Sequence, residues 1–321
     1  MPTTTQPTHP YAVARARVLR ARRLSPHFMR VVLGGPGMAR IGNSGNPVYD
    51  QRIKLLFPRP PHGLPPLPDS PEWYREWLAL PRDQRGDMRT YSIRALRQGA
   101  AAGGAEATEL TVDFALHLAP GSSGPAAEWA RGARPGREIL VVGPRRGVDR
   151  GTGIAFAPGQ TRAITLAGDE TAAPAIARIL EDLPRHHPAA TARAYIEVPS
   201  AADRLPIDHA PTASVEWLPR QGAPRGSLLD AALRYHVTAR HRDAAHGGAP
   251  LPPPRLTGDA SRLVWEVPDP SAQEAPAEPY YWVAGESGVV RGLRRYLVRE
   301  AGVPRSRVAF MGYWRRGVAM A

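Results

Sequence analysis

Four residues of the run Arg89–Arg94 (RTYSIR) carry side chains suited to a flat ligand that bears phosphate groups. Tyr91 offers a ring for stacking, Ser92 a short hydrogen-bonding group, and Arg89 and Arg94 guanidinium groups that bind phosphate through paired hydrogen bonds. The alternation of residue types predicts a strand, with Arg89 and Tyr91 on one face and Ser92 and Arg94 on the other. Taken alone, the run is also compatible with a half-exposed strand carrying solvated arginines.

A second group of candidate residues lies where strands are expected to meet helices. Gly168–Pro174 follows the apolar run 162–167, so Thr171 is placed to cap the next helix, and free amides there attract an anion. Gly285-Glu286-Ser287 repeats this arrangement after residues 281–284, which favours a cleft with two sides. Neither turn has the GxGxxG spacing of a dinucleotide fingerprint, so an ordinary capped turn is the alternative.

Single residues elsewhere have both a functional and a structural interpretation. Lys54 is the only lysine of the chain and stands within an apolar run, either as a surface lysine or as an electrostatic anchor for a ligand. His117 is expected to contact a nucleotide or to form an ordinary hydrogen bond at a strand end. Trp129 and Trp314 either bracket a planar ring or pack in the core.

Composition excludes several kinds of chemistry. The 321 residues include no cysteine, so disulfides, thiolate metal sites and a cysteine nucleophile are excluded. The histidines lack ligand spacing, and we predict no metal site. The sequence contains no GxSxG motif, which argues against a hydrolase. The net charge of +13 comes from scattered arginines, which favours attraction of anionic ligands rather than nucleic-acid binding.

The polar stretch at residues 1–10 lacks the apolar core of a signal peptide, and no apolar run approaches the roughly 18 residues of a membrane span. We therefore expect a soluble, cytoplasmic protein without membrane insertion. The oligomeric state is not readable from the sequence.

Residue patterning changes near position 160. Before it, short strands alternate with turns, which predicts a small antiparallel β-barrel. The expected strands are 12–19, 29–33, 52–57, 88–97, 109–117 and 138–142, with a short helix near 72–80 and a helix starting at 124. After it, strands alternate with helices, which predicts a parallel sheet with ligands at the carboxyl ends of its strands. The expected strands are 162–167, 191–198, 215–218, 281–284 and 308–313, the expected helices 175–183, 228–237 and 289–300, and 241–279 is expected to be a poorly ordered insertion.

Several of these segments, in this order, resemble the siderophore-interacting protein family of flavin-dependent ferric-siderophore reductases, within the ferredoxin-reductase-like superfamily. The motifs are SPHFMRVVLGGPGM, RIKLLFP, RTYSIR, DFALH, GPAAEWA, AGDETAAPAIARILEDLP, WVAGESGVVRGLRRYLVREAGV and GYWRRG. The resemblance spans nearly the whole chain. The chain departs from the family pattern in a longer loop at 117–124 and in apparent insertions at 58–87 and 240–279.

The resemblance implies two domains: an antiparallel FAD-binding β-barrel at residues 1–158 and a parallel-sheet NAD(P)H-binding α/β domain at residues 159–321, with 240–279 as a flexible insertion. It also implies roles for particular residues. Tyr91 would pack on the isoalloxazine and Ser92 would lie near its reactive edge. The implied FAD contacts are Arg89, Thr90, Tyr91, Ser92, Arg94, Asp113, Phe114, Ala115, Leu116, His117, Gly124, Pro125, Ala126 and Ala127, and the implied NAD(P)H contacts are Gly168, Asp169, Glu170, Thr171, Pro174, Gly285 and Glu286.

The implied activity is electron transfer from NADPH or NADH through FAD to the Fe(III) of a ferric siderophore, which releases the iron as Fe(II). Lys54 and Arg145 are the candidates that attract the anionic chelate. A general flavin or quinone reductase on the same scaffold, and a flavin-free siderophore-binding protein, are the alternatives. The choice between NADH and NADPH stays open, with Arg291, Arg294 and Arg295 as candidates for contact with a 2′-phosphate.

Overall fold

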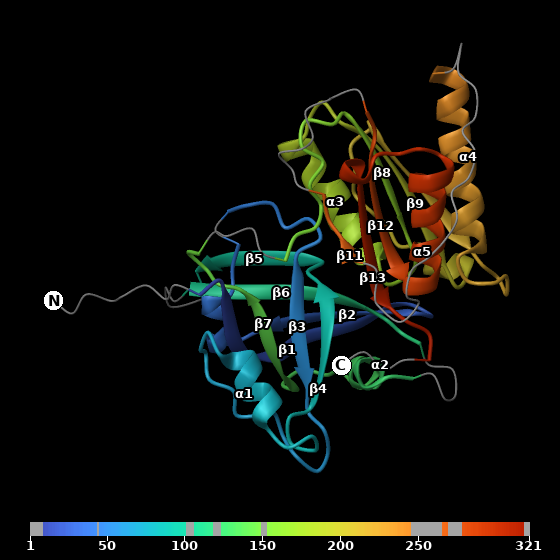
Figure 1. Cartoon of the computed structure of the whole chain (residues 1–321). Helices are drawn as coiled ribbons and strands as arrows, with labels where there is room; N and C mark the ends of the chain where they lie inside the picture. The colour runs from blue at the N-terminus through green and yellow to red at the C-terminus, as the bar shows by residue number, and fades with distance from the viewer. Residues whose placement is uncertain are drawn as a thin grey trace. The chain divides into compact units, whose positions relative to one another are not determined.

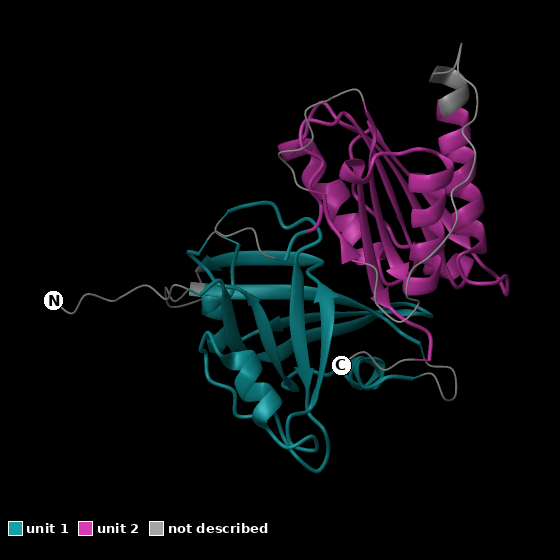
Figure 2. Cartoon of the chain, in the orientation of Figure 1, with its two compact units in different colours: residues 1–154, 321 teal, residues 155–320 magenta. Residues whose placement is uncertain are grey.

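The computed structural model describes residues 9–43, 45–100, 106–117, 123–148, 153–244, 265–268 and 278–317. The chain folds as two compact units, residues 1–154 (unit 1) and residues 155–320 (unit 2) (Figure 2). Among the described residues, no helix combines the length and the apolarity needed to cross a membrane. Each unit is built around its own β-sheet (Figure 1).

In the described part of unit 1, the sheet has seven strands in the order β4-β3-β7-β1-β2-β6-β5, and neighbouring strands are antiparallel. The strands are β1 (Tyr11–Ser25), β2 (Phe28–Gly34), β3 (Arg52–Phe57), β4 (Asp87–Ser92), β5 (Ala95–Ala100), β6 (Glu106–Ala115) and β7 (Glu138–Pro144). A 3-10 turn, η1 (Pro36–Arg40), follows β2.

Two residues carry the chain from one end of this sheet to the other. β4 and β5 are the outermost strands, yet only Ile93 and Arg94 separate them. The Ile93 amide donates to Gln51 O at 2.8 Å beside β3, and the Arg94 amide donates to Thr111 O at 2.9 Å on β6. The sheet must therefore curl until its ends meet, which confirms the expected antiparallel barrel. The expectation of one continuous strand over 88–97 is wrong, because β4 pairs with β3 whereas β5 pairs with β6.

The interior of the curled sheet holds the core of unit 1. Phe57, Phe114 and Trp129 are buried there, with Trp129 supplied by α2 (Pro125–Arg131). The opposite face of the sheet is covered by the segment that follows β3, where Trp77 of α1 (Trp73–Ala79) packs on Leu56. The short helix expected near 72–80 is confirmed, and the segment forms part of the packing of unit 1.

The sheet of unit 2 has the order β10-β9-β8-β12-β13-β11. Its strands are β8 (Ala163–Gly168), β9 (Thr191–Val198), β10 (Ala213–Pro219), β11 (Trp265–Glu266), β12 (Tyr280–Glu286) and β13 (Val308–Trp314). All neighbouring strands are parallel except β11, which is antiparallel to β13. Strands such as β8 and β12 are almost wholly buried, as expected for a parallel sheet with helices on both faces. The expected parallel sheet is confirmed.

Among the described residues of unit 2, three helices cover this sheet: α3 (Ala173–His186), α4 (Ser227–Ala244) and α5 (Ser287–Arg295), the last continuing as one π-helical turn, Tyr296–Glu300. Figure 1 shows α3 on one face and α4 and α5 on the other. Two 3-10 turns, Ala201–Asp203 and Arg305–Arg307, complete unit 2. Strand order runs outward from β8 to β10 and then returns to β12 on the other side of β8, so the topological switch point lies between β8 and β12.

The expected insertion over 241–279 lies mostly outside the described residues. The part that the structure describes includes β11, whose Trp265 pairs with Met311 of β13. That pair corrects the expectation for these residues, because β11 extends the sheet by one short edge strand.

Candidate functional site

β4 presents the first candidate residues of unit 1. Thr90 lies opposite Lys54 of β3 in the strand register, and the Lys54 ammonium donates to the Thr90 hydroxyl at 2.7 Å. Burial, and secondarily Arg52, lowers the pKa of the Lys54 ammonium. Arg89 is partly exposed and uses one guanidinium nitrogen on the carbonyl of Met88. Ser92 is buried at the end of the strand.

Tyr91 belongs to an aromatic cluster inside the curled sheet. Its ring centre lies 4.6 Å from that of Phe114 and 6.5 Å from that of Phe57. Trp129 packs on both phenylalanines, at 5.9 and 5.5 Å. Burial raises the pKa of the Tyr91 phenol far above its usual range, against a smaller lowering by Arg89, so the phenol is neutral near pH 7. The partly exposed Tyr91 ring therefore has a rigid aromatic backing, which suits it to stacking on a planar ligand.

Arg94 is anchored from β6. Its side chain is largely buried, and its Nε lies 3.7 Å from the Asp113 carboxylate. Asp113 is buried as well and receives two hydrogen bonds of 2.7 Å from Arg30, its register neighbour on β2. The Asp113 carboxylate is thus engaged by two arginines. The Asp113 carboxylate therefore positions Arg94. We expect any ligand contact at Asp113 to come from its backbone.

The remaining candidates of unit 1 lie around the start of α2. His117 comes two residues after β6, residues 118–122 lie outside the described residues, and Gly124 precedes the helix. No atom would contact a Cβ added at Gly124 within 4 Å, so the backbone there is open to a ligand. The first amides of a helix lack acceptors within the helix. The Trp129 indole N–H of the same helix is buried and makes no hydrogen bond among the described residues. These features fit a large phosphorylated cofactor such as FAD.

Arg145 does not stand at a ligand entrance. Its side chain is only 6% exposed and donates to Asp69 at 2.5 Å, to the Tyr11 carbonyl at 2.9 Å and to the ring of His9. Burial raises the pKa of Asp69, but the Arg145 hydrogen bond and the Val13 amide outweigh it, so the net pKa is lowered. Together with the Val13 amide, this ion pair fastens the segment after β3 to the start of β1. The expectation that Arg145 attracts a substrate is corrected accordingly.

In unit 2, Asp169 connects the carboxyl ends of three strands. One carboxylate oxygen accepts from the Thr171 amide and hydroxyl, and the other accepts from the Glu286 amide at 2.8 Å and the Trp314 indole at 2.9 Å. Burial, and then the charge of Glu170, raises the pKa of Asp169 to about 6 in spite of these bonds. A Cβ at Gly285 would lie 2.8 Å from this carboxylate, and Gly285 has a φ of +148°, so only glycine fits.

Glu170 is fully buried and does not face a ligand. It accepts from both terminal nitrogens of Arg220, at 2.8 and 3.1 Å, and from Arg225 at 2.6 Å. Glu197, at the end of β9, also accepts from Arg220 and from the amides of Gly226 and Leu229. The carboxylate of Glu170, a residue that the resemblance implies as an NAD(P)H contact, is therefore bonded within the protein.

The helix starts of unit 2 are also less open than the sequence indicates. Glu286 caps α5 with its own carboxylate, which accepts from the amides of Gly288 and Val289. At α3 the Thr171 hydroxyl donates to Asp169 instead of capping the helix, and the amides of Ala172 and Ala173 donate to the Asp169 carbonyl. Neither helix start offers the free set of amides that the sequence analysis assumed.

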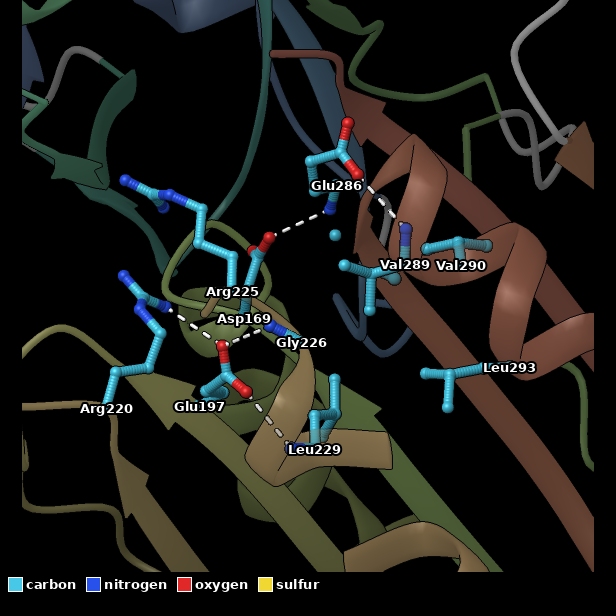
Figure 3. Close-up of a pocket in the computed structure, with 12 residues that line it drawn as sticks. Asp169, Glu197, Arg220, Arg225, Gly226, Leu229, Glu286, Val289, Val290 and Leu293 are labelled. Carbon is cyan, nitrogen blue, oxygen red and sulfur yellow. Dashed lines mark hydrogen bonds and ion pairs between the residues drawn. The ribbon is translucent and has the colours of Figure 1, made fainter. Parts of the chain in front are cut away.

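A pocket opens at the switch point of the sheet of unit 2 (Figure 3). Its cavity is small, about 10 Å³, and the surrounding hollow of about 290 Å³ is counted out into open solvent. It is lined by Asp169, Glu197, Arg220, Arg225, Gly226, Leu229, Ala284, Gly285, Glu286, Val289, Val290 and Leu293. The position matches the rule that open parallel sheets bind ligands at the carboxyl ends of strands beside the switch point. Of the expected residues, Asp169, Gly285 and Glu286 line this pocket.

The loop between β10 and α4, residues 220–226, lines the pocket although its residues were not among the predicted site residues. Arg220, Arg225 and Gly226 all come from this loop. Two arginines and two glycines directly after a parallel strand were a usable signal, because that is the edge where a ligand is expected. Glu197, the last acidic residue of β9, carried the same signal.

The two units give this chain a fold that is known from other proteins. The chain shares its fold with the ferredoxin–NADP+ reductase of Plasmodium falciparum, with a TM-score of 0.54 at 10% identity over 94% of this chain and 96% of that one. A family model described as "Siderophore-interacting FAD-binding domain" matches residues 17–148, and one described as "Siderophore-interacting protein" matches residues 161–317.

Individual relatives agree with the family models. An uncharacterised protein of Mycobacterium tuberculosis is 32% identical over 94% of this chain and 89% of its own length. A protein of Escherichia coli named NADPH-dependent ferric-chelate reductase is 27% identical over 92% and 91%. The crystal structure of a siderophore utilization protein from T. fusca matches with a TM-score of 0.64 at 28% identity, over 98% of this chain and 97% of that one.

The chain belongs to the siderophore-interacting protein family. It is a flavoprotein oxidoreductase with an FAD-binding domain, and its relative in Escherichia coli is named as NADPH-dependent. The fold class, family and cofactors expected from the sequence are confirmed.

Proposed function

We propose that the chain is a cytoplasmic NAD(P)H:ferric-siderophore oxidoreductase, with an FAD-binding domain at residues 1–158 and an NAD(P)H-binding domain at residues 159–321. The observation that carries the proposal is that each unit has its own candidate site for one of the two nucleotides. Unit 1 holds Tyr91 on a rigid aromatic backing, and unit 2 has a pocket at the switch point of a parallel sheet. Relatives named as ferric-chelate reductases support the substrate class.

In unit 1, Tyr91 would pack on the flavin ring while Ser92 holds a hydrogen bond at the reactive edge. Arg89 and Arg94 would bind the phosphates, with Arg94 held in place by Asp113. The further FAD contacts in this proposal are Thr90, Phe114, Ala115, Leu116, His117, Gly124, Pro125, Ala126 and Ala127. FAD bound by these residues would supply the chemistry that converts the two-electron hydride of NAD(P)H into single electrons for ferric iron.

In unit 2, the carboxylate of Asp169 would hold the backbone of Gly285 and Glu286 in the shape that receives the nucleotide. Gly168, Thr171 and Pro174 complete the turn. A Cβ at Gly168 would lie 2.5 Å from the Cβ of Ala172 and 2.8 Å from the carbonyl of Ala284, so the strand ends can approach only with glycine there.

The chelate would be attracted by charge. The net charge of +13 favours an anionic ferric chelate, and Lys54 is the candidate that meets it. Reduction weakens the binding of iron to hard oxygen ligands, which releases Fe(II). No protein metal ligand is needed for this reaction.

The decisive experiment is an anaerobic spectral titration of the purified full chain. Flavin absorbance that is bleached by NADPH or NADH, and then returns when a ferric siderophore is added with a ferrous chelator present, is the expected result. A protein that takes up FAD and reacts with the nucleotide but passes electrons only to free flavin or quinone would contradict the siderophore assignment. A protein that binds the siderophore yet takes up no FAD would indicate a binding protein.

A further inference from the structure

The pocket of unit 2 contains one arginine whose charge faces solvent. Of the two arginines that line the pocket, Arg220 has a side chain only 6% exposed and bonded to two carboxylates. The side chain of Arg225 is 38% exposed. In Figure 3 the Arg225 guanidinium extends away from the α5 residues Val289 and Val290. The pocket therefore has a polar end at Arg225 and an apolar end at α5.

Two contacts hold the Arg225 guanidinium in place and leave some of its N–H donors unused. Its Nη1 donates to Glu170 at 2.6 Å, and its guanidinium carbon lies 5.1 Å from the ring centre of Trp314. Among the described residues, the structure gives its Nε and Nη2 no polar partner. A guanidinium that is fixed on one edge and open on the other is preorganised to bind a phosphate through two hydrogen bonds.

The carboxylates paired with Arg220 and Arg225 balance the charge of the two arginines. Glu170 and Glu197 together carry two negative charges, and Arg220 and Arg225 carry two positive charges, so the four groups balance. Asp169 and Glu286 also line the pocket, but the Asp169 carboxylate accepts from amide, hydroxyl and indole groups, and the Glu286 carboxylate caps α5. Arg225 is the group in the pocket lining that offers unused donors to an incoming anion.

The residue at the position of the usual NADH determinant is already hydrogen-bonded within the protein. In dinucleotide-binding folds, an acidic residue after the second strand binds the ribose diol of NADH, and an arginine nearby accommodates the 2′-phosphate of NADPH. Glu197 occupies the acidic position at the end of β9. Both of its oxygens are already bonded to backbone amides, and one also to Arg220, so a ribose hydroxyl would have to displace them.

Helix α5 supplies no competing site. Arg294 and Arg295 lie at the end of α5 that is distant from the carboxyl ends of the strands, paired with Glu266 and Glu300. The expectation that these two arginines meet a 2′-phosphate is corrected by that position. Arg291 lies one turn into α5 and does not line the pocket.

We propose that Arg225 binds the 2′-phosphate of the electron donor and makes this chain selective for NADPH over NADH. The inference rests on the proposed function, because it specifies the donor of that same reaction. The group that would be bound is a phosphate monoester on a ribose. The unused N–H groups of the Arg225 guanidinium, at the mouth of the pocket, would donate to it.

The test measures binding of two probes to the full chain loaded with FAD: 2′,5′-ADP, which carries the 2′-phosphate, and 5′-AMP, which lacks it. Isothermal calorimetry of the unaltered protein is expected to show about 10- to 100-fold tighter binding of 2′,5′-ADP. In Arg225→Gln this ratio should fall to about one. Measurable binding of 5′-AMP by the variant reports that its pocket is intact.

Arg185→Gln is the matched control. It removes the same charge from an exposed position of unit 2, near the carboxyl end of α3 and thus at the opposite edge of the sheet. The control should keep the full preference for 2′,5′-ADP. Loss of the preference in both variants would mean that only net charge matters, and would overturn the inference.

Two further results would also overturn it: an unaltered protein that binds both probes equally, or an Arg225→Gln variant that keeps the preference. Either result leaves the proposed function standing if NADH or NADPH still bleaches the flavin. If neither nucleotide bleaches the flavin while 2′,5′-ADP binding still depends on Arg225, the proposed function fails and the binding site remains.

Discussion

The two units balance their buried carboxylates in different ways. In unit 1, Asp113 is paired with Arg30, its direct neighbour on the adjacent strand, and with Arg94 farther off. In unit 2, Glu170 and Glu197 share Arg220, and each of the three comes from the end of a different strand. A register pair forms whenever two strands align. The second network forms only when the loops at three strand ends are all in place, so the pocket of unit 2 depends on long-range electrostatics.

The largest expected effect comes from removing the shared arginine. Arg220→Met leaves two buried carboxylates without their main partner, and such a loss typically costs about 3–5 kcal/mol. Arg30→Met in unit 1 should cost less, about 1–2 kcal/mol, because Arg30 is partly exposed and Arg94 still faces Asp113. Urea denaturation of the full chain, followed by tryptophan fluorescence, measures both values.

Arg185→Met is the control for these two stability measurements. Arg185→Met removes an exposed arginine of unit 2 and should change stability by less than about 0.5 kcal/mol. Equal losses for Arg220→Met and Arg30→Met would show that the two networks carry the same energetic weight, contrary to the geometry.

The second prediction concerns pH and Asp169. Its pKa is raised from an ordinary 3.8 to about 6, so the folded state holds this proton more tightly than the unfolded state does. The contribution to stability is therefore fully present below about pH 4 and is lost as the pH rises through about 6. At about 1.4 kcal/mol per unit of pKa, the loss amounts to at most ~3 kcal/mol.

Stability curves of the unaltered protein and of Asp169→Asn isolate this effect. The difference in unfolding free energy between them should decrease between about pH 4 and pH 6 and stay level above that range. A difference that is constant across the range would mean that Asp169 titrates normally, and that its four hydrogen bonds outweigh its burial and the charge of Glu170.

Local pattern was sufficient to predict most elements of both units. The strands β3 and β9 fall at the predicted residues, because apolar runs of strand length bounded by turns leave little choice. The break at Ile93 and Arg94 was not predictable, because it depends on β5 pairing with β6 rather than with β3. Strand pairing at that distance in sequence leaves no mark in the local alternation of residues.

Side-chain roles were harder to predict than elements. Tyr91 was chosen for its ring, and it does lie in an aromatic cluster. Glu170 was included as part of the turn after β8 and Arg145 was chosen for its charge, yet both are buried in ion pairs with residues 50 or more positions away. The local sequence around a charged residue at the end of a strand is the same whether its side chain faces a ligand or a residue that is distant in sequence. Only the three-dimensional pairing separates the two cases.

The smallest expected effect separates the two cations first assigned to the chelate. Lys54→Gln removes a charge that lies partly exposed on β3, and it should raise KM for an acidic ferric chelate about 2- to 5-fold, less at high salt. Arg145→Gln should leave that KM unchanged and instead lower stability by about 1–3 kcal/mol, because Asp69 and the Tyr11 carbonyl lose their buried donor.

Steady-state kinetics with an acidic chelate and a neutral acceptor, together with urea denaturation of each variant, measures this contrast. The neutral acceptor should be reduced normally by both variants, since attraction of an anion is the function under test. A higher chelate KM in Arg145→Gln, or an unchanged one in Lys54→Gln, would mean that the chelate is drawn to a different surface of unit 1 than the face that Lys54 shares with Thr90.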